Sequence, residues 1–153
     1  MPQLFWEKTL AVLLIEDSPD YVSLVQQWLS LRTDVAFAVH WVDSLRAGLN
    51  DLKHRETDVI LLDLGLPDSN GLETFTRIKF QASAVPIIVL TGDNSKLLAL
   101  QTVQDGAQDY IVKGSANGDS VASAIQFAVL RTADRAKKNM TAPSDRAAAW
   151  WSS

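Results

Sequence analysis

Four short runs of apolar residues constrain the fold of this chain more strongly than any other feature. They span residues 10–15, 58–62, 85–90 and 110–112, and a weaker fifth run spans 35–41. Each of the four is almost continuously apolar, whereas a strand with one wet face alternates apolar and polar residues. Such runs are typical of strands that are covered on both faces, as in a parallel sheet.

Segments with helical spacing of apolar residues separate the runs. Leu45, Leu49 and Leu52 recur at the spacing of one helical face. Ser18-Pro19 combines a capping hydroxyl with a proline suited to the first helical turn. Further helix starts are expected at Asp43 or Ser44, at Asn70, at Asp93 or Asn94, and at the turn 117–120. The order strand then helix, repeated five times, predicts an α/β fold with a doubly wound, five-stranded parallel sheet.

Length and local composition indicate one domain with two short flanks. A chain of 153 residues is long enough for a single core and short for two. We expect an N-terminal extension over 1–9, a folded domain over 10–131, and an extended helix end with a tail or linker over 132–153. In that last segment Pro143 breaks the helical pattern, and Trp150-Trp151 follow without a core to join.

Composition excludes several classes of function. The chain has no cysteine, which removes disulfides, thiolate metal sites and thiol nucleophiles. Its net charge of −4 disfavours direct nucleic-acid binding, because that binding relies on a basic surface. No apolar run approaches the ~20 residues of a membrane span, and residues 1–8 lack the features of a secretory signal. We therefore expect a cytoplasmic protein that does not enter a membrane.

Polar residues follow the predicted strands at the edge where their carboxyl ends meet. They are Glu16-Asp17 after the first strand, Asp63 at the end of the third, Thr91-Gly92-Asp93 at the fourth and Lys113-Gly114 at the fifth. Ligands of doubly wound sheets bind at this edge. Clustered carboxylates repel one another unless a cation neutralises them, and hard oxygen ligands suit Mg²⁺. Carboxylates beside one hydroxyl and one lysine therefore predict a site for Mg²⁺ together with a phosphoryl group.

The same residues carry a resemblance to a known family. In chain order its motifs are Glu16-Asp17, Asp63-Leu64-Gly65-Leu66-Pro67 through Gly71, Thr91-Gly92 and Tyr110-Ile111-Val112-Lys113. From residue 10 to about residue 131, the chain resembles the receiver domain of two-component response regulators. The resemblance implies the flavodoxin-like fold with strand order 2-1-3-4-5, and a phosphoacceptor function in a two-component phosphorelay.

The resemblance also implies roles for individual residues. Asp63 is similar to the aspartate that takes a phosphoryl group from a histidine kinase. Asp17 is expected to bind Mg²⁺ directly, with Asp63 and the backbone carbonyl of Gly65 as further ligands. Glu16 is expected to act on the ion through water. Lys113 is similar to the lysine that pairs with the phosphoryl group.

The resemblance implies that a second group of residues takes part in a conformational switch. Thr91 resembles the hydroxyl that turns toward the phosphoryl group, and Tyr110 resembles the aromatic residue that moves inward with it. Phosphorylation is expected to reshape the surface formed by the fourth helix, the fifth strand and the fifth helix. Asp93 is expected to overlook the pocket and to modulate the lifetime of the phosphoryl group. Receivers usually carry proline after the lysine, whereas Gly114 follows Lys113 here, so we expect either a trans bond with an altered loop or a strained bond.

The leading hypothesis is a non-enzymatic signalling module, phosphorylated by a histidine kinase or phosphotransfer protein and acting on a downstream protein. A homodimer through the fourth helix, fifth strand and fifth helix is a further expectation. The domain stands alone or belongs to a longer protein, such as a multidomain kinase or a diguanylate cyclase protein. A Mg²⁺-dependent phosphatase with an aspartyl-phosphate intermediate needs a second aspartate where this chain has Gly65. An interaction domain with an unused pocket is the remaining alternative.

Overall fold

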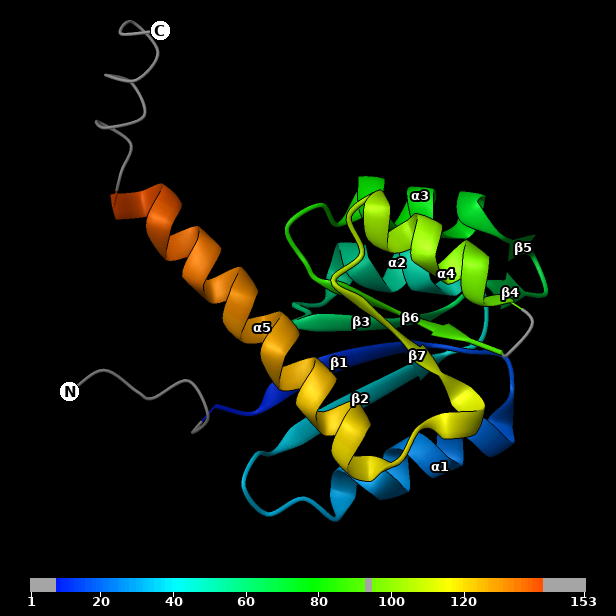
Figure 1. Ribbon diagram of the computed structural model, residues 1–153, viewed down its shortest axis with the longest axis horizontal. Helices are drawn as coiled ribbons and strands as arrows, with labels where there is room; N and C mark the ends of the chain where they lie inside the picture. The colour runs from blue at the N-terminus through cyan, green and yellow to red at the C-terminus, as the bar shows by residue number, and fades with distance from the viewer. Residues whose placement is uncertain (1–7, 93–94, 142–153) are drawn as a thin grey trace, which may run out of the picture.

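The chain folds around one parallel sheet. The computed structural model describes residues 8–92 and 95–141, with side chains up to residue 135. The strands of the sheet are β1 (Leu10–Ile15), β2 (Phe37–Val42), β3 (Val59–Asp63), β6 (Ile87–Thr91) and β7 (Asp109–Val112). Their spatial order is β2-β1-β3-β6-β7, which is the predicted order 2-1-3-4-5 of the five runs (Figure 1). The doubly wound fold is therefore confirmed.

Helices cover both faces of the sheet. They are α1 (Pro19–Ser30), α2 (Leu45–His54), α3 (Leu72–Gln81), α4 (Lys96–Gln104) and α5 (Gly118–Thr141). One face is covered by α1 and α5, and the other by α2, α3 and α4 (Figure 1). Adjacent strand residues serve opposite faces, because Leu14 belongs to the core under α1 and α5 and Leu13 to the core under the other three helices. This two-sided burial explains why the strands are apolar at almost every position.

The first two helices begin where the sequence predicts. The Ser18 hydroxyl accepts a hydrogen bond from the Tyr21 N–H at 3.4 Å, and Pro19 is the first residue of α1. The Ser44 hydroxyl accepts a hydrogen bond from the Ala47 N–H at 3.1 Å, so Ser44 caps α2. Each hydroxyl satisfies one backbone donor that the first helical turn leaves without a partner.

The loop between β3 and α3 differs from the expectation. Gly65–Leu66 form strand β4 and Ser69–Asn70 form strand β5, a short antiparallel hairpin. Because Asn70 is paired with Gly65 in this hairpin, it does not cap α3, and that prediction is wrong. Gly71 occupies the cap position with a φ of 70°, a conformation that glycine adopts without strain.

The fourth helix begins later than expected. Ser95 occupies the cap position of α4, while Asp93 and Asn94 lie outside the described residues. Among the residues that the structure describes, no side-chain hydrogen bond is found at the cap of this helix, in contrast to α1 and α2. Packing of its apolar residues contributes to holding the helix in place, and Ala99 among them is fully buried.

The last helix begins at a reciprocal cap and is long. The Asn117 side chain accepts from the Ser120 N–H, and the Ser120 hydroxyl accepts from the Asn117 N–H, both at 2.9 Å. The helix continues to Thr141, so helical structure crosses the expected domain boundary at residue 131. Trp150 and Trp151 lie outside the described residues. In the described part of the chain, no helix has the length and apolar character to span a membrane.

Candidate functional site

Three carboxylates converge at the carboxyl ends of β1 and β3. Glu16 and Asp17 follow β1, and Asp63 ends β3. The parallel pairing of Ile15 with Leu62 brings these positions side by side. Carboxylate oxygens of Glu16, Asp17 and Asp63 all lie within 4.8 Å of one another. Glu16 is fully buried and Asp17 is exposed, so this acidic cluster is closed on one side and open to solvent on the other.

The ammonium group of Lys113 enters the acidic cluster from another strand. Lys113 follows β7, which is separated from β3 by β6. Its Nζ lies 2.5 Å from Oε1 of Glu16 and 3.3 Å from Oδ2 of Asp63. The second oxygen of Glu16 accepts the Ser18 N–H at 3.1 Å. The lysine therefore offsets part of the negative charge and links the ends of β1, β3 and β7.

Burial and neighbouring charges change the proton affinity of the site. The pKa of Glu16 is raised to about 7, because burial and the proximity of Asp63 outweigh the lowering effect of Lys113. Burial by itself would lower the pKa of Lys113, but the hydrogen bond to Glu16 and the charge of Asp63 raise it above its usual value. Lys113 is therefore charged at neutral pH, whereas Glu16 is partly protonated there.

The raised pKa of Glu16 predicts a stability that depends on pH when divalent cations are absent. Between the ordinary pKa of 4.5 and the folded pKa of about 7, the folded chain holds a proton that the unfolded chain releases. The free energy of unfolding therefore falls as the pH rises through this window, and stability is greatest below it. The wild type should lose on the order of 2 kcal/mol of its free energy of unfolding across this window. Glu16→Gln removes the titrating group, so we expect the variant to keep that free energy. Urea unfolding in EDTA at about pH 5 and about pH 7.5 measures the free energy of unfolding of both proteins. An equal decrease in the wild type and in Glu16→Gln would contradict the prediction.

Backbone groups also hold the Asp63 carboxylate. The N–H of Gly65 donates to Oδ1 of Asp63 at 3.0 Å, while Oδ2 faces Lys113. Gly65 is the first residue of β4 and is exposed. The β4–β5 hairpin therefore places the backbone of Gly65 directly beside the acidic cluster.

Two long-range contacts that steady this edge of the sheet have no signal in the sequence. The indole N–H of Trp41, on β2, donates to the backbone carbonyl of Glu16 at 2.7 Å. Asp68, in the turn of the β4–β5 hairpin, accepts the N–H groups of Leu45 and Arg46 at 2.8 and 3.0 Å. The hydrogen bond from Arg46, together with that from Leu45, lowers the pKa of Asp68. Only folding brings these partners together, since they are far apart in the chain.

The two residues expected to act as a switch lie on the neighbouring strands β6 and β7. Thr91 is buried, and its hydroxyl donates to the carbonyl of Gly92 at 3.0 Å rather than to the acidic cluster. Tyr110 pairs with Val89 and packs, half-buried, against the core under α2, α3 and α4. Asp93, expected to modulate the site, lies outside the described residues. The structure thus brings together the carboxylates and the lysine, and leaves the switch hydroxyl turned to the backbone.

The segment after Lys113 has the trans bond and altered loop that were one of the two expectations. The Lys113–Gly114 peptide bond is trans, and Lys113–Ser115 form a single 3₁₀ turn. The chain then continues through Ala116 in an extended conformation to the cap of α5. The altered loop is therefore a short turn that carries the lysine at its first residue.

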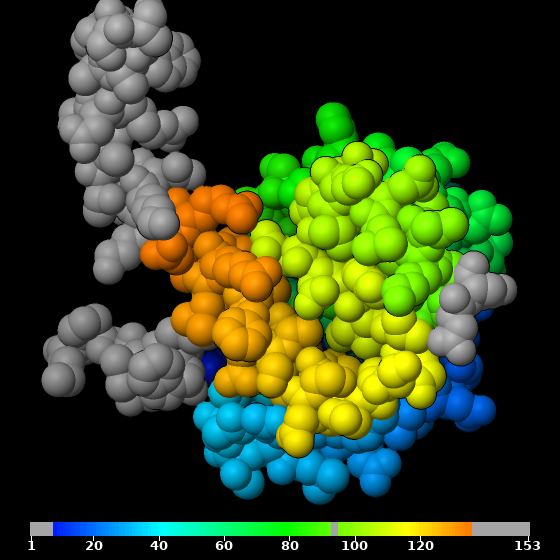
Figure 2. Space-filling view, in the orientation of Figure 1, coloured from blue at the N-terminus to red at the C-terminus, as the bar shows by residue number. Residues whose placement is uncertain are grey.

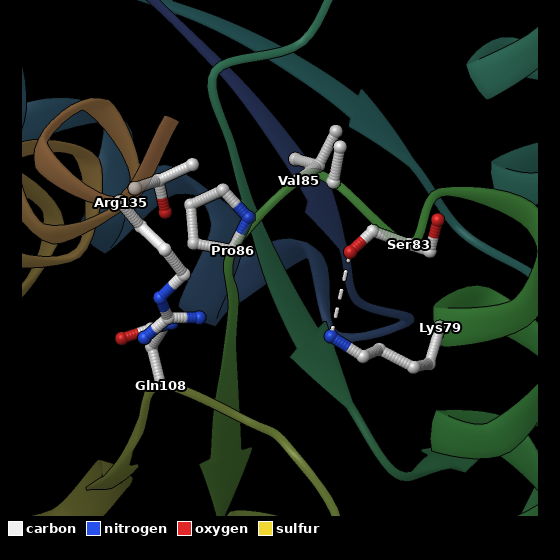
Figure 3. Close-up of a pocket in the computed structure, with 8 residues that line it drawn as sticks. Lys79, Ser83, Val85, Pro86, Gln108 and Arg135 are labelled. Atoms are coloured by element: carbon white, nitrogen blue, oxygen red, sulfur yellow. Dashed lines mark hydrogen bonds between the residues drawn. The ribbon is translucent and has the colours of Figure 1, made fainter. Parts of the chain in front are cut away.

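A separate hollow of about 250 Å³ lies at the amino ends of the strands, away from the acidic cluster (Figure 3). Its labelled lining residues are Lys79, Ser83, Val85, Pro86, Gln108 and Arg135. Pro86 and Gln108 immediately precede β6 and β7, so the hollow is at the amino ends of the strands. The Lys79 ammonium donates to the Ser83 carbonyl at 3.5 Å. This hollow is therefore distinct from the acidic cluster, which lies at the carboxyl ends.

The fold and the site together define a class of protein. It is a doubly wound α/β domain with an acidic, lysine-containing site at the carboxyl ends of its strands. The family model described as the response regulator receiver domain matches residues 12–125. The chain belongs to this receiver family, and the domain is a signalling module of two-component systems.

Curated relatives agree with this assignment. The regulatory protein LuxO of Vibrio vulnificus is 32% identical over 100 residues, which are 65% of this chain and 21% of LuxO. The KDP operon transcriptional regulatory protein KdpE of Escherichia coli is 35% identical over 134 residues, which are 86% of this chain and 54% of KdpE. The chain therefore spans only part of the length of the curated relatives that it matches.

Solved structures show the same fold. The signal receiver domain of a LuxO repressor protein from Vibrio parahaemolyticus superimposes with a TM-score of 0.73 at 26% identity, covering 84% of this chain and 95% of that one. Full-length FixJ from B. japonicum gives a TM-score of 0.76 at 25% identity, covering 92% of this chain and 68% of FixJ. The isolated receiver domain of the LuxO protein thus matches 84% of this chain.

Proposed function

We propose that this receiver domain accepts a phosphoryl group on Asp63 in a two-component phosphorelay. The observation that carries the proposal is the contact between the Lys113 ammonium and Oδ2 of Asp63, beside two further carboxylates. A histidine kinase or a phosphotransfer protein is the phosphodonor. The domain transmits the signal to a downstream protein and does not turn over an external substrate.

The surroundings of Asp63 suit a carboxylate nucleophile. Both of its oxygens have a partner, the N–H of Gly65 at 3.0 Å and the ammonium of Lys113 at 3.3 Å, so the carboxylate is oriented. In the transfer, an Asp63 oxygen forms a bond to phosphorus while the phosphorus–nitrogen bond of phosphohistidine breaks. The bonding electron pair returns to the imidazole, and Asp63 becomes an acyl phosphate. The Lys113 ammonium supplies a positive charge beside the phosphoryl oxygens.

The donor set of the acidic cluster fits Mg²⁺. Its carboxylate oxygens are hard ligands that lie within 4.8 Å of one another. Asp17, Asp63 and the backbone carbonyl of Gly65 would hold the ion directly, and Glu16 would act through water. When bound, Mg²⁺ offsets carboxylate charge and polarises phosphoryl oxygens.

Intact-protein mass spectrometry with acetyl phosphate tests this function. We expect the wild-type chain to gain the mass of one phosphoryl group in Mg²⁺ and to remain unmodified in EDTA, because carboxylate repulsion opposes an anionic donor when no cation is bound. A chain that stays unmodified in Mg²⁺ would contradict the proposal. Steady release of phosphate from unrelated phosphomonoesters would indicate a phosphatase instead, although Gly65 offers no carboxyl group as its general acid.

The output surface in this proposal consists of α4, β7 and α5. Figure 2 shows α4 and α5 on one face of the molecule. Both helices carry exposed apolar side chains. Leu97 on α4 is 81% exposed and Phe127 on α5 is 59% exposed. Movement of Thr91 and Tyr110 on phosphorylation would reshape this surface, since Tyr110 lies on β7 and Thr91 lies on β6, the strand that pairs with β7. We expect the reshaped surface to form a homodimer.

Sedimentation velocity tests the homodimer. With Mg²⁺ and beryllofluoride, we expect the wild-type chain to dimerise and Phe127→Ala to weaken the association by about tenfold, since an exposed aromatic anchor is lost. Phe80→Ala is the matched control, because Phe80 is 90% exposed but lies on α3, outside this surface. A wild-type chain that remains monomeric, or an equal effect of the control, would contradict the dimer.

The remaining parts of the proposal concern the whole protein. Residues 10–131 form the receiver domain, 1–9 an extension, and 132–153 the end of a helix with a linker. The domain acts alone or, as the alternative, within a longer protein such as a multidomain kinase or a diguanylate cyclase protein. The cytoplasm is the proposed location, which is consistent with membership of the receiver family.

A further inference from the structure

We infer that Tyr21 is the positioning residue for Lys113, because the face of its ring holds the lysine ammonium at the acidic cluster. The inference rests on the proposed phosphoacceptor function. Nζ of Lys113 lies 4.9 Å from the centroid of the Tyr21 ring. A cation within about 6 Å of an aromatic face is attracted by the negative charge of the π-system. The ammonium therefore has three partners in the described structure, namely the ring and the carboxylates of Glu16 and Asp63.

One of the two carboxylate partners, Asp63, changes during the proposed reaction, and the ring does not. Asp63 becomes an acyl phosphate and loses its charged oxygen. The ring of Tyr21 keeps its electrostatic character throughout. It therefore attracts the ammonium both before and after a phosphoryl group arrives on Asp63.

The backbone around Lys113 gives the side chain little restraint. Gly114 follows the lysine, and the 3₁₀ turn Lys113–Ser115 has no buried residue. A lysine side chain is flexible along its four-carbon stem. The position of the Lys113 ammonium must therefore be set by the groups that contact it, and Tyr21 is the uncharged group among them.

The Tyr21 ring is itself fixed by the fold. Tyr21 is 9% exposed and lies in the first turn of α1, shortly after Glu16 and Asp17 in the chain. Its ring meets the ring of Trp28 edge to face, with centroids 6.3 Å apart and an interplanar angle of 89°. Trp28 in turn faces the start of α5, where a side chain on Gly118 would come within 3.4 Å of it. Trp28 is therefore supported by the start of α5, and the Tyr21 ring packs against Trp28.

The ring, and not the hydroxyl group, is the part of Tyr21 that the inference uses. The hydroxyl oxygen is buried and has no hydrogen-bond partner among the described residues. Burial, with the charges of Glu16 and Asp63, raises the pKa of Tyr21 to about 12, so the phenol stays neutral. Phenylalanine preserves the ring and removes the hydroxyl, whereas leucine removes the ring. The two substitutions therefore separate the two parts of the side chain.

Binding of beryllofluoride in Mg²⁺, followed by fluorine NMR, tests the inference. We expect Tyr21→Phe to bind within about twofold of the wild type and Tyr21→Leu to bind about three- to tenfold more weakly, the range of a partly desolvated cation–π contact. In a Lys113→Met background, Tyr21→Leu should cause no further loss, because the ammonium is already absent. Urea unfolding verifies that each variant is folded, and Tyr21→Met replaces Tyr21→Leu if the latter is not.

Three outcomes would overturn the role of Tyr21. They are equal binding by Tyr21→Leu and the wild type, equal loss in Tyr21→Phe and Tyr21→Leu, and a full loss from Tyr21→Leu in the Lys113→Met background. The proposed function fails separately, if the wild type binds no beryllofluoride and acetyl phosphate leaves it unmodified. If acetyl phosphate modifies the wild type and Tyr21→Leu binds beryllofluoride as tightly as the wild type does, only the positioning role of Tyr21 is refuted.

Discussion

Asp63→Asn is expected to abolish phosphorylation of this chain by acetyl phosphate in Mg²⁺. The amide has no charged oxygen to attack phosphorus, although it is as large as the carboxylate and can still accept the N–H of Gly65. Intact-protein mass spectrometry should show one phosphoryl group on the wild type and none on the variant. Phosphorylated Asp63→Asn, with the group mapped to another residue, would contradict the assignment of Asp63.

A matched control and a stability measurement separate loss of the nucleophile from loss of the fold. Asp105 is an exposed acidic residue at the end of α4, so Asp105→Asn should be modified like the wild type. The charge of Asp63 is one cause of the raised pKa of Glu16, so its removal relieves repulsion inside the acidic cluster. We therefore expect Asp63→Asn to unfold in urea at a concentration no lower than the wild type does.

Phe75→Ala is expected to have the largest effect on stability. Phe75 lies on α3, is 1% exposed, and packs in the core between the sheet and α2, α3 and α4. Removing a buried aromatic ring loses its transfer free energy and leaves a cavity, which together cost about 3 to 5 kcal/mol. For a domain of this size, the midpoint of thermal unfolding should fall on the order of 10 °C.

Phe80→Ala provides the matched control on the same helix. Phe80 is 90% exposed, so its removal should change the free energy of unfolding by less than about 0.5 kcal/mol. Urea unfolding of both variants measures the contrast. Comparable losses from the two substitutions would show that burial of Phe75 is not what stabilises α3 against the sheet.

Local patterns predicted the main elements because each pattern has a local physical cause. The apolar runs follow from burial on both faces of a parallel sheet, and Leu13 and Leu14 indeed serve opposite cores. Ser18 caps α1 because its hydroxyl reaches an N–H three residues away. Asn70 failed as a cap because a hairpin of two-residue strands, too short for any periodic signal, engages it.

The acidic residues of the site could be predicted from the sequence, whereas their partners could not. Parallel strands must place their carboxyl ends at one edge, so Glu16, Asp17 and Asp63 were expected together, and the structure brings them together. The contacts of Trp41 with Glu16 and of Tyr21 with Lys113 join residues from different elements. Such contacts depend on helix and strand packing, for which a single sequence carries no periodic signal.

By itself, the sequence determined the order of strands and helices, the doubly wound class of the fold, and the edge at which the charged residues gather. These properties follow from burial patterns and caps, which act over a few residues. Only the tertiary structure decided that Lys113 bridges Glu16 and Asp63, that burial brings the pKa of Glu16 near neutrality, and that an aromatic ring on α1 faces the ammonium. The reason is that electrostatic interactions depend on distance and on exclusion of water, and both are set when elements far apart in the chain pack together.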